Sequence, residues 1–194
     1  MSERKIEKLE NIAHIDISGV DKKSKENETP VKLCNFTDVY NNWAITDRMV
    51  DSFMTATANS DEISRFSLKN GMVAITKDSE TRDDIGISTY IADDLDNTVL
   101  GYHTALIIPD EEKIDGSYLN GYLQSKTART YFSNLASGSG QRYTLTIGGI
   151  GSVKVEMPPL SEQKKIGKLL SAIDRKIEIN NQINDNLYQS TMVA

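Results

Sequence analysis

Apolar and polar residues alternate with a period of two in several short segments of the first 110 residues, which is typical of strands. Residues 12–17 alternate and end at Gly19. The segment VKLCNFTDVY (31–40) alternates as well and predicts a strand that continues to Asp38. The segment WAITDRMVDSF (43–53) fits either a strand or a short helix.

Later segments add further strands to this prediction. An Asn70-Gly71 pair precedes the apolar run MVAIT (72–76), and this combination predicts a β-hairpin with the preceding ISRFSL (63–68). The stretches IGISTYIADD (85–94) and TVLGYHTALIIPD (98–110) predict two or three more strands. The first part of the chain is therefore expected to consist mainly of short strands.

From residue 115 the spacing of apolar residues becomes helical. Asp115 or Ser117 is the expected N-cap of this helix, which closes at the small-residue loop SGSGQRYT (137–144). The segment IGGIGSVKVEMPP (147–159) predicts a final strand with a glycine-rich start.

A helix of roughly thirty residues is expected after Pro159, with Ser161 as N-cap, and it would be roughly 45 Å long. A seven-residue repeat would place Asn180 and Asn184 on its apolar seam, whereas rotation of the stripe towards Ile183 and Leu187 would leave both asparagines in solvent. A single helix cannot bury its own apolar stripe, so a partner helix is expected. The expected contact residues are Ile166, Leu169, Leu170, Ile173, Ile177, Asn180, Ile183, Asn184 and Leu187.

The pattern as a whole predicts an α+β fold with two parts. Residues 1–157 form a domain of mixed short strands, and residues 158–194 form the long helix. With 194 residues, 38% hydrophobic and 26% charged, the chain has the composition of an ordinary globular protein. No stretch approaches the roughly eighteen apolar residues of a membrane span, and the charged N-terminus is unlike a signal peptide, so a cytoplasmic location is expected.

Charge and cysteine usage narrow the chemistry. The net charge is −6, and residues 78–115 hold eleven acidic residues but only Arg82 and Lys113 as bases. This balance argues against a generally basic nucleic-acid binder, so any DNA contact must come from local clusters. Cys34 is the single cysteine, which excludes an internal disulfide and a multi-cysteine zinc site, and it is expected in the core.

No catalytic motif is evident in the sequence. There is no Ser-His-Asp pattern, no Walker motif and no GxGxxG before a helix. The acids Asp78, Glu80, Asp83 and Asp84 lack the lysine of a metal-dependent nuclease, and His14 and His103 lack partners for a metal. We therefore expect a non-enzymatic protein without metal or cofactor.

One segment, PPLSEQKKIGKLLSAIDRKIE (158–178), strongly resembles the junction between a target-recognition domain and a long helix in specificity (S) subunits of type I restriction–modification systems. Weaker similarities follow in matching order: IEKLENIAHIDISG, LKNGMVAITKDSETRDDIGIS, HTALIIPDEEKIDGSYLNGYLQS and SGSGQRYTLTIGGIGSVKVEMPPL. The family has two recognition domains and two such helices, whereas this chain has one of each. It is expected to be either a half-subunit or a fragment.

The resemblance implies a non-catalytic subunit that binds double-stranded DNA and reads one half of a bipartite target. The helix would set the spacing and dock a methyltransferase (M) subunit, which carries S-adenosylmethionine and methylates adenine; a restriction (R) subunit joins some such systems. Two half-subunits paired through antiparallel helices would form a homodimer with two-fold symmetry. Such a dimer would read a gapped palindrome.

Three loops carry the side chains expected to contact DNA, because they combine basic residues with small polar ones. They are DKKSK, KDSETRDD and SGSGQRYT, and their candidate residues are Lys22, Lys23, Lys25, Lys77, Arg82, Ser139, Gln141, Arg142 and Tyr143. The alternative for each is an ordinary solvated loop. Arg48 is a lesser candidate that could equally pair with Asp47 or Asp51, and Trp43 and Tyr40 are expected to pack the fold.

Another class of function is also compatible with the sequence. The acidic segment 78–115 could bind a basic partner, as a mimic of DNA or as a dimeric adaptor, with the helix serving only dimerisation. In a third interpretation the long helix is buried within a larger protein.

Overall fold

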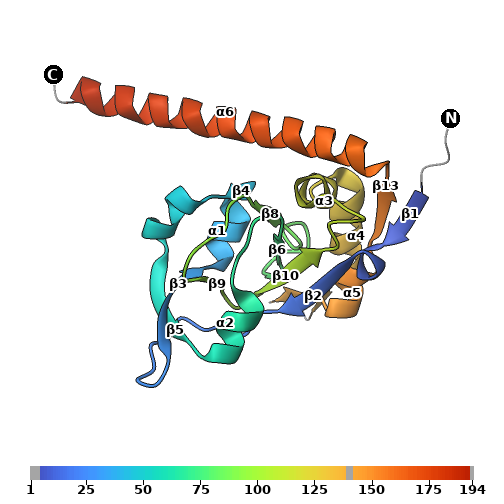
Figure 1. Cartoon of the computed structure of the whole chain (residues 1–194), viewed down its shortest axis with the longest axis horizontal. Coiled ribbons are helices and arrows are strands. Elements are labelled where there is room, and N and C mark those ends of the chain that lie inside the picture. The colour runs from blue at the N-terminus through green and yellow to red at the C-terminus, as the bar shows by residue number, and fades with distance from the viewer. Residues whose placement is uncertain (1–4, 139–141, 193–194) are drawn as a thin grey trace.

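The computed structural model describes residues 5–138 and 142–192, which form a strand-rich head and one long helix (Figure 1). At the centre lies a five-stranded sheet. Its strand order is β2 (Ala13–Ile17), β10 (Thr104–Pro109), β6 (Val73–Thr76), β8 (Ser88–Ile91), β4 (Ala44–Ile45). All neighbours in this sheet are antiparallel except β8 and β4.

Three smaller sheets and six helices accompany this central sheet within the described residues. The sheets are β5 (Met54–Ala58) with β3 (Thr29–Cys34) and β9 (Thr98–Leu100); β1 (Lys5–Lys8) with β13 (Lys154–Met157); and β11 (Ser137–Gly138) with β12 (Tyr143–Thr144) and β7 (Asp78–Ser79). The helices are α1 (Phe36–Asn41), α2 (Ser60–Phe66), α3 (Gly116–Leu123), α4 (Lys126–Leu135), α5 (Ile147–Gly151) and α6 (Leu160–Met192), with 3₁₀ segments η1 (Leu9–Asn11) and η2 (Asp47–Ser52).

The central sheet is buried on both faces, which explains the continuous apolar runs in β6 and β10. Val73 and Ile75 point into one core, shared with α3, α4 and α5, whereas Ala74 between them belongs to a second core under β3 and β5. Ala105 and Leu106 divide in the same way. Strands covered on both sides need apolar residues at successive positions rather than at alternate ones. Cys34 is fully buried in the second core, as predicted.

Two predicted strands are wrong in part, because local capping favours helices there. The strand of 31–38 ends at Cys34, and α1 begins after Asn35, whose backbone N–H donates to the Asp38 carboxylate at 2.7 Å. The glycine-rich start of the last strand is instead α5, whose N-cap Thr146 accepts a hydrogen bond from Gly149 N–H. The undecided segment 43–53 contains both β4 and η2.

The predicted hairpin at Asn70-Gly71 is also wrong. Residues before it form α2, which a capping box between Asn59 and Glu62 starts. Gly71 does turn the chain, at φ +89°, but it connects a helix to β6, and β6 pairs with β8 and β10. An Asn-Gly turn therefore did not specify which element precedes it.

The helical prediction after residue 115 is confirmed, with Asp115 as N-cap of α3; Ser125 starts a second helix, α4. Helix α6 begins at Leu160, before the predicted N-cap Ser161. The carbonyl of Pro159 accepts the first hydrogen bonds, from Glu162 and Gln163 N–H, so Ser161 lies within the helix rather than capping it.

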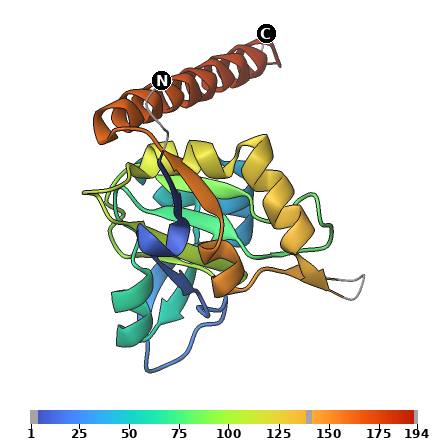
Figure 2. The same ribbon diagram turned by 90° about the vertical axis from the view of Figure 1, so that its right-hand side faces the viewer.

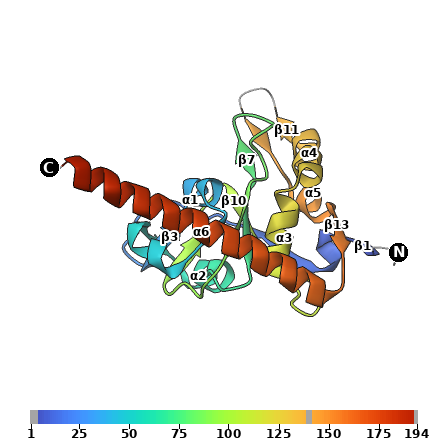
Figure 3. The same ribbon diagram turned by 90° about the horizontal axis from the view of Figure 1, so that it is seen from above.

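Helix α6 has 33 residues and is therefore about 50 Å long. It starts against α3, crosses the head and extends past it (Figures 1 and 3). In Figure 2 the same helix lies above α3, and the β11–β12 arm extends from the side of the head. No helix within the described residues is long and apolar enough to cross a bilayer.

Candidate functional site

The turn between β9 and β10, at Tyr102 and His103, collects the three basic loops that the sequence singles out. Lys22 Nζ lies 5.9 Å from the centre of the Tyr102 ring, and Tyr102 N–H donates to the carbonyl of Val20 at 2.9 Å. Lys77 N–H donates to the carbonyl of His103 at 3.0 Å. Arg142 Nη2 lies 2.9 Å from His103 Nε2. Residues far apart in the sequence thus form one basic cluster around this turn.

The Asp78 carboxylate lies close to several side chains of this cluster. It lies 2.9 Å from Lys77 Nζ and 2.7 Å from His103 Nδ1, and Arg142 Nη2 is 3.9 Å away. Burial alone would raise the pKa of Asp78, but hydrogen bonds from Thr144, Lys77 and His103 outweigh it and lower the pKa below its usual value. Asp78 therefore holds a negative charge that orders the cations around it.

The neighbouring loop 80–86 presents Arg82. Its guanidinium lies 5.0 Å from the centre of the Tyr143 ring, a cation–π distance. The loop is held from behind by Arg129, which donates to the carbonyls of Asp83 and Ile85. Gly86 contacts Phe132 so closely, at φ +73°, that a Cβ would collide with the ring. Arg82 thus extends from a well-anchored loop.

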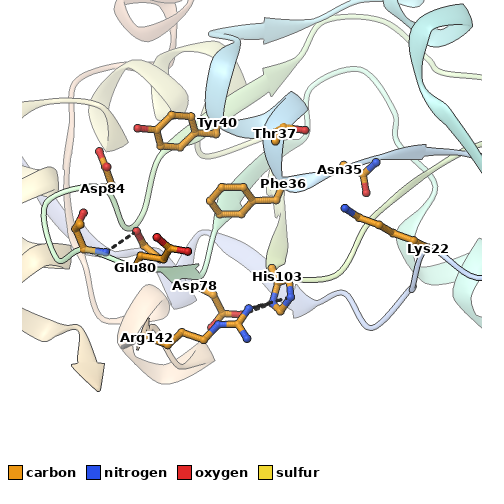
Figure 4. Close-up of a pocket in the computed structure, with 12 residues that line it drawn as sticks. Lys22, Asn35, Phe36, Thr37, Tyr40, Asp78, Glu80, Asp84, His103 and Arg142 are labelled. Atoms are coloured by element: carbon orange, nitrogen blue, oxygen red, sulfur yellow. Dashed lines mark hydrogen bonds and ion pairs between the residues drawn. The ribbon is translucent and has the colours of Figure 1, made fainter. Parts of the chain in front are cut away.

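A cleft of about 700 Å³ opens beside the cluster (Figure 4). Lys22, His103 and Arg142 line one side of it. Across the cleft stand Phe36 and Tyr40 of α1, whose rings stack with centres 5.8 Å apart. A hydrogen bond to Asp84 raises the pKa of Tyr40. The cleft therefore joins cationic donors, acidic acceptors and aromatic surface.

Asn35 adds a polar group to this cleft. Its side-chain oxygen is buried and has no hydrogen-bond partner among the described residues. Unsatisfied buried acceptors cost free energy unless a ligand completes them. The combination of cations, amide and aromatic groups suits the phosphates and base edges of nucleic acid.

The predicted site residues divide into three groups. Lys22, Lys77, Arg82, Arg142 and Tyr143 meet at the cluster and its adjoining loop. Lys23 and Lys25 lie elsewhere: the carbonyl of Lys23 and the N–H of Lys25 contact Thr57 on β5, and Lys25 Nζ pairs with Glu28 at 3.1 Å. Ser139 and Gln141 lie outside the described residues.

Sequence reasoning missed the residues that hold the site together. Asp78 was considered only as a metal ligand, and His103 only as a metal ligand without a partner. No group of His, Cys, Asp or Glu within residues 5–138 and 142–192 is arranged to hold a metal ion. The proximity of the 102–103 turn to three separate loops depends on strand pairing, which no local pattern reports.

Several acids of segment 78–115 serve contacts within the chain. Asp110 pairs with Lys113 at 2.7 Å, Asp94 accepts from Asn70 N–H, and Asp115 caps α3. This use weakens the interpretation of the segment as a surface for a basic partner.

The outer face of α6 is a second candidate surface. Leu169, Ile173, Ile177, Ile183 and Leu187 are each at least half exposed. Two members of the predicted contact set differ from the others: Ile166 packs against the first core, and Leu170 touches Gly121 of α3. These two side chains are partly buried against the head, and their contact with a partner helix stays a prediction. Asn180 and Asn184 are exposed beside the remaining stripe.

Between α6 and the head lies a smaller cleft of about 380 Å³. Its lining includes Arg48 and Asp47 of η2 together with Asp174 and Glu178 of α6. Arg48 is thus remote from the basic cluster.

Comparison with known proteins gives a consistent result. A family model described as "Type I restriction modification DNA specificity domain" matches residues 1–189. The "Type I restriction enzyme HindI specificity subunit" of Haemophilus influenzae is 32% identical over 112 residues, covering 57% of this chain and 24% of that protein.

Two solved structures have a similar fold. One comes from a structural study of "complex assembly and conformational transition of the type I R-M system"; its TM-score is 0.59 at 14% identity, covering 94% of this chain and 41% of the other. The second is the type I S subunit from M. genitalium, with a TM-score of 0.56 at 15% identity, covering 96% and 45%. The chain spans about a quarter of the curated relative and under half of each solved chain.

Proposed function

Because the chain belongs to the family of type I restriction–modification DNA specificity domains, we propose that it is the non-catalytic subunit that selects the DNA sequence to be methylated. The head reads one half of a bipartite target in double-stranded DNA. The protein acts in the cytoplasm and needs no cofactor of its own. S-adenosylmethionine is bound by the methyltransferase subunit that docks onto the chain, and a restriction subunit joins where the system also cleaves.

The basic cluster at Tyr102 and His103 is the observation that carries this proposal. An acidic chain can bind DNA only where cations gather locally, and Lys22, Lys77 and Arg142 gather at this turn, with Arg82 on the adjoining loop. The adjoining cleft offers Asn35 and Thr37 for base edges. Lys22, the loop 77–84 and Arg142 therefore contribute to one interface.

The exposed stripe of α6 supports a second part of the proposal. We infer that two copies of the chain pair through antiparallel α6 helices, which places two equal heads at a fixed separation. Such a dimer reads a gapped palindrome, because a two-fold symmetric protein demands a two-fold symmetric site.

The direct test is to map methylated adenines across a genome that expresses the methyltransferase subunit with or without this chain. We expect a gapped symmetric motif to appear only with the chain. The motif then supplies a duplex for binding measurements against random DNA of equal length. Equal affinity of the assembled complex for both duplexes would refute sequence selection.

Arg142→Ala tests the basic cluster. We expect it to weaken binding of the complex to the motif duplex by about tenfold, and to reduce the salt slope by about one if Arg142 meets a phosphate. Arg48→Ala is the matched control, because Arg48 lies in the other cleft, and its affinity should stay at the wild-type value. Unchanged affinity for Arg142→Ala would remove the β11–β12 arm from the interface.

A further inference from the structure

His103 has a backbone conformation that is uncommon for residues other than glycine. Its φ is +70°, in the left-handed region, which histidine, asparagine and aspartate enter more often than other side chains but still seldom. The residue occupies the turn into β10, and its carbonyl accepts a hydrogen bond from Lys77 N–H at 3.0 Å. Residues in sparsely populated backbone conformations cluster at functional sites, so the contacts of the His103 side chain are relevant to function.

The imidazole links the buried carboxylate to the exposed arginine. Nδ1 lies 2.7 Å from Asp78 Oδ2, and Arg142 Nη2 lies 2.7 Å from Nδ1 and 2.9 Å from Nε2. The imidazole therefore lies between the Asp78 carboxylate and the Arg142 guanidinium and contacts both. The ring also lies 4.0 Å from that of Tyr102, which fixes its orientation from the other side. Figure 4 shows this chain of contacts at the floor of the cleft.

Arg142 needs such support because of where it stands. Its side chain is 57% exposed on the β11–β12 arm, and a free arginine loses much rotamer freedom when it meets DNA. The contacts described for its guanidinium all use Nη2, towards His103 and Asp78. Nε and Nη1 are then left for a phosphate or for a guanine edge.

We propose that His103 is a positioning residue that orders Arg142 before DNA arrives, and that the strained turn is retained for this purpose. The inference rests on the proposed function, because it concerns the same interface. It goes further because it assigns a role to His103, which is not among the residues expected to contact DNA. The ordering entropy of Arg142 is lost during folding instead of during binding, so affinity for DNA rises.

Three substitutions separate positioning from a structural role. His103→Gly removes the ring and fits the left-handed backbone; His103→Asn also fits it and keeps an amide that can donate and accept. The third variant combines His103→Gly with Arg142→Ala. All are measured as the full chain in complex with its methyltransferase, by thermal unfolding and by binding to the motif duplex and to random DNA.

We expect His103→Gly to weaken binding to the motif duplex by about tenfold while Tm stays within about 3 °C of wild type. His103→Asn should bind within about threefold of wild type. In the Arg142→Ala background, His103→Gly should add less than about twofold, because a positioning residue has nothing left to position.

The contrary results are distinct. The positioning role would be overturned if His103→Gly bound the motif duplex as the wild type does, or if its tenfold loss persisted in the Arg142→Ala background. The proposed function would stay intact in either case, as long as the wild-type complex discriminates between the two duplexes. A parallel fall of Tm and affinity in both His103 variants would also overturn it, in favour of a purely structural residue. Failure of the wild-type complex to discriminate between the duplexes would refute the proposed function itself.

Discussion

The two halves of α6 differ in what surrounds them, although both carry apolar residues at helical spacing. In the proximal half (160–171), Gln163 and Gly167 are buried against α3, and Leu170 touches Gly121. In the distal half (172–192), Ile173, Ile177 and Ile183 are half exposed. The proximal half fixes the helix to the head, and the distal half leaves β-branched apolar side chains in water. One helix thus combines an anchor with an open surface.

Close fit explains the anchor. A Cβ at position 167 would collide with Ser117, and one at position 121 with Leu170, so glycines on both helices permit the approach. The side-chain amide of Gln163 supplies hydrogen-bond partners to three backbone groups. It accepts from Asp115 N–H at 3.0 Å and donates to the carbonyls of Lys113 and Pro158 at 3.2 and 2.8 Å. These contacts fit only one orientation of α6 on the head. Because the helix is continuous, the direction of its distal half is set as well.

Introducing charge on the distal stripe should have the largest effect. With Ile173→Asp and Ile177→Asp together, pairing of two helices would bury four carboxylates, and we expect self-association to weaken by at least about a thousandfold, or about 4 kcal/mol. Sedimentation equilibrium measures this loss. Circular dichroism should show unchanged unfolding of the head, since both positions are exposed.

Gln182→Asp is the matched control for that variant. Gln182 is exposed, and at about 100° per residue it lies on the opposite side of the helix from Ile173. It should assemble as the wild type does. Equal losses in the two variants, or none in the double variant, would contradict pairing through the stripe.

Breaking the anchor should have the next largest effect. Gln163→Ala leaves three buried or partly buried backbone groups without their partner, and we expect the free energy of unfolding to fall by about 3 kcal/mol. Urea unfolding measures the change.

The same substitution in the distal half sharpens the contrast. Gln182 is exposed, and its amide donates to the Glu178 carboxylate at 3.1 Å, so Gln182→Ala should cost less than about 0.5 kcal/mol. Similar losses for both glutamines would show that the two halves do not differ in anchoring.

Much of this contrast was predictable only in outline. The PPLSEQ segment and the apolar spacing predicted a long helix after Pro159, and it is present. The sequence could not say which apolar residues face the head, because Ile166 and Ile173 occupy the same row of a seven-residue repeat. Only the position of α3, set by tertiary packing, covers Ile166 and leaves Ile173 exposed.

The basic site was predictable to a similar degree. Basic residues in small-residue loops pointed to Lys22, Lys77 and Arg142, which do meet. Asp78 and His103 were considered only for metal binding, because a histidine at positive φ has no sequence signal and its partner is 25 residues away. Local capping also overrode alternation at residues 35–38, where a short helix replaced the end of a strand. The residue pattern therefore identified the basic side chains, whereas their proximity depends on strand pairing.

A small effect is also expected where the two halves meet. Asp174 faces the cleft between α6 and the head, where burial, and then the charge of Glu178, raise its pKa above the usual 3.8. A carboxyl with a raised pKa in the folded state destabilises that state when ionised, so the penalty is present at neutral pH and disappears as pH falls through the raised pKa. Asp174→Asn should therefore stabilise the protein at pH 7, by less than about 1 kcal/mol because the group is partly hydrated. Near about pH 3 the variant and wild type should unfold alike.

Glu162→Gln removes a carboxylate charge that should stabilise the helix, in contrast to the charge of Asp174. Glu162 is exposed in the first turn of α6, where a negative charge stabilises the positive end of the helix dipole. Loss of that charge should lower stability at neutral pH by about 0.5 kcal/mol. Thermal unfolding at pH 7 should thus shift upward for Asp174→Asn and downward for Glu162→Gln. Shifts of the same sign would mean that general charge, and not the contact between α6 and the head, governs this part of the helix.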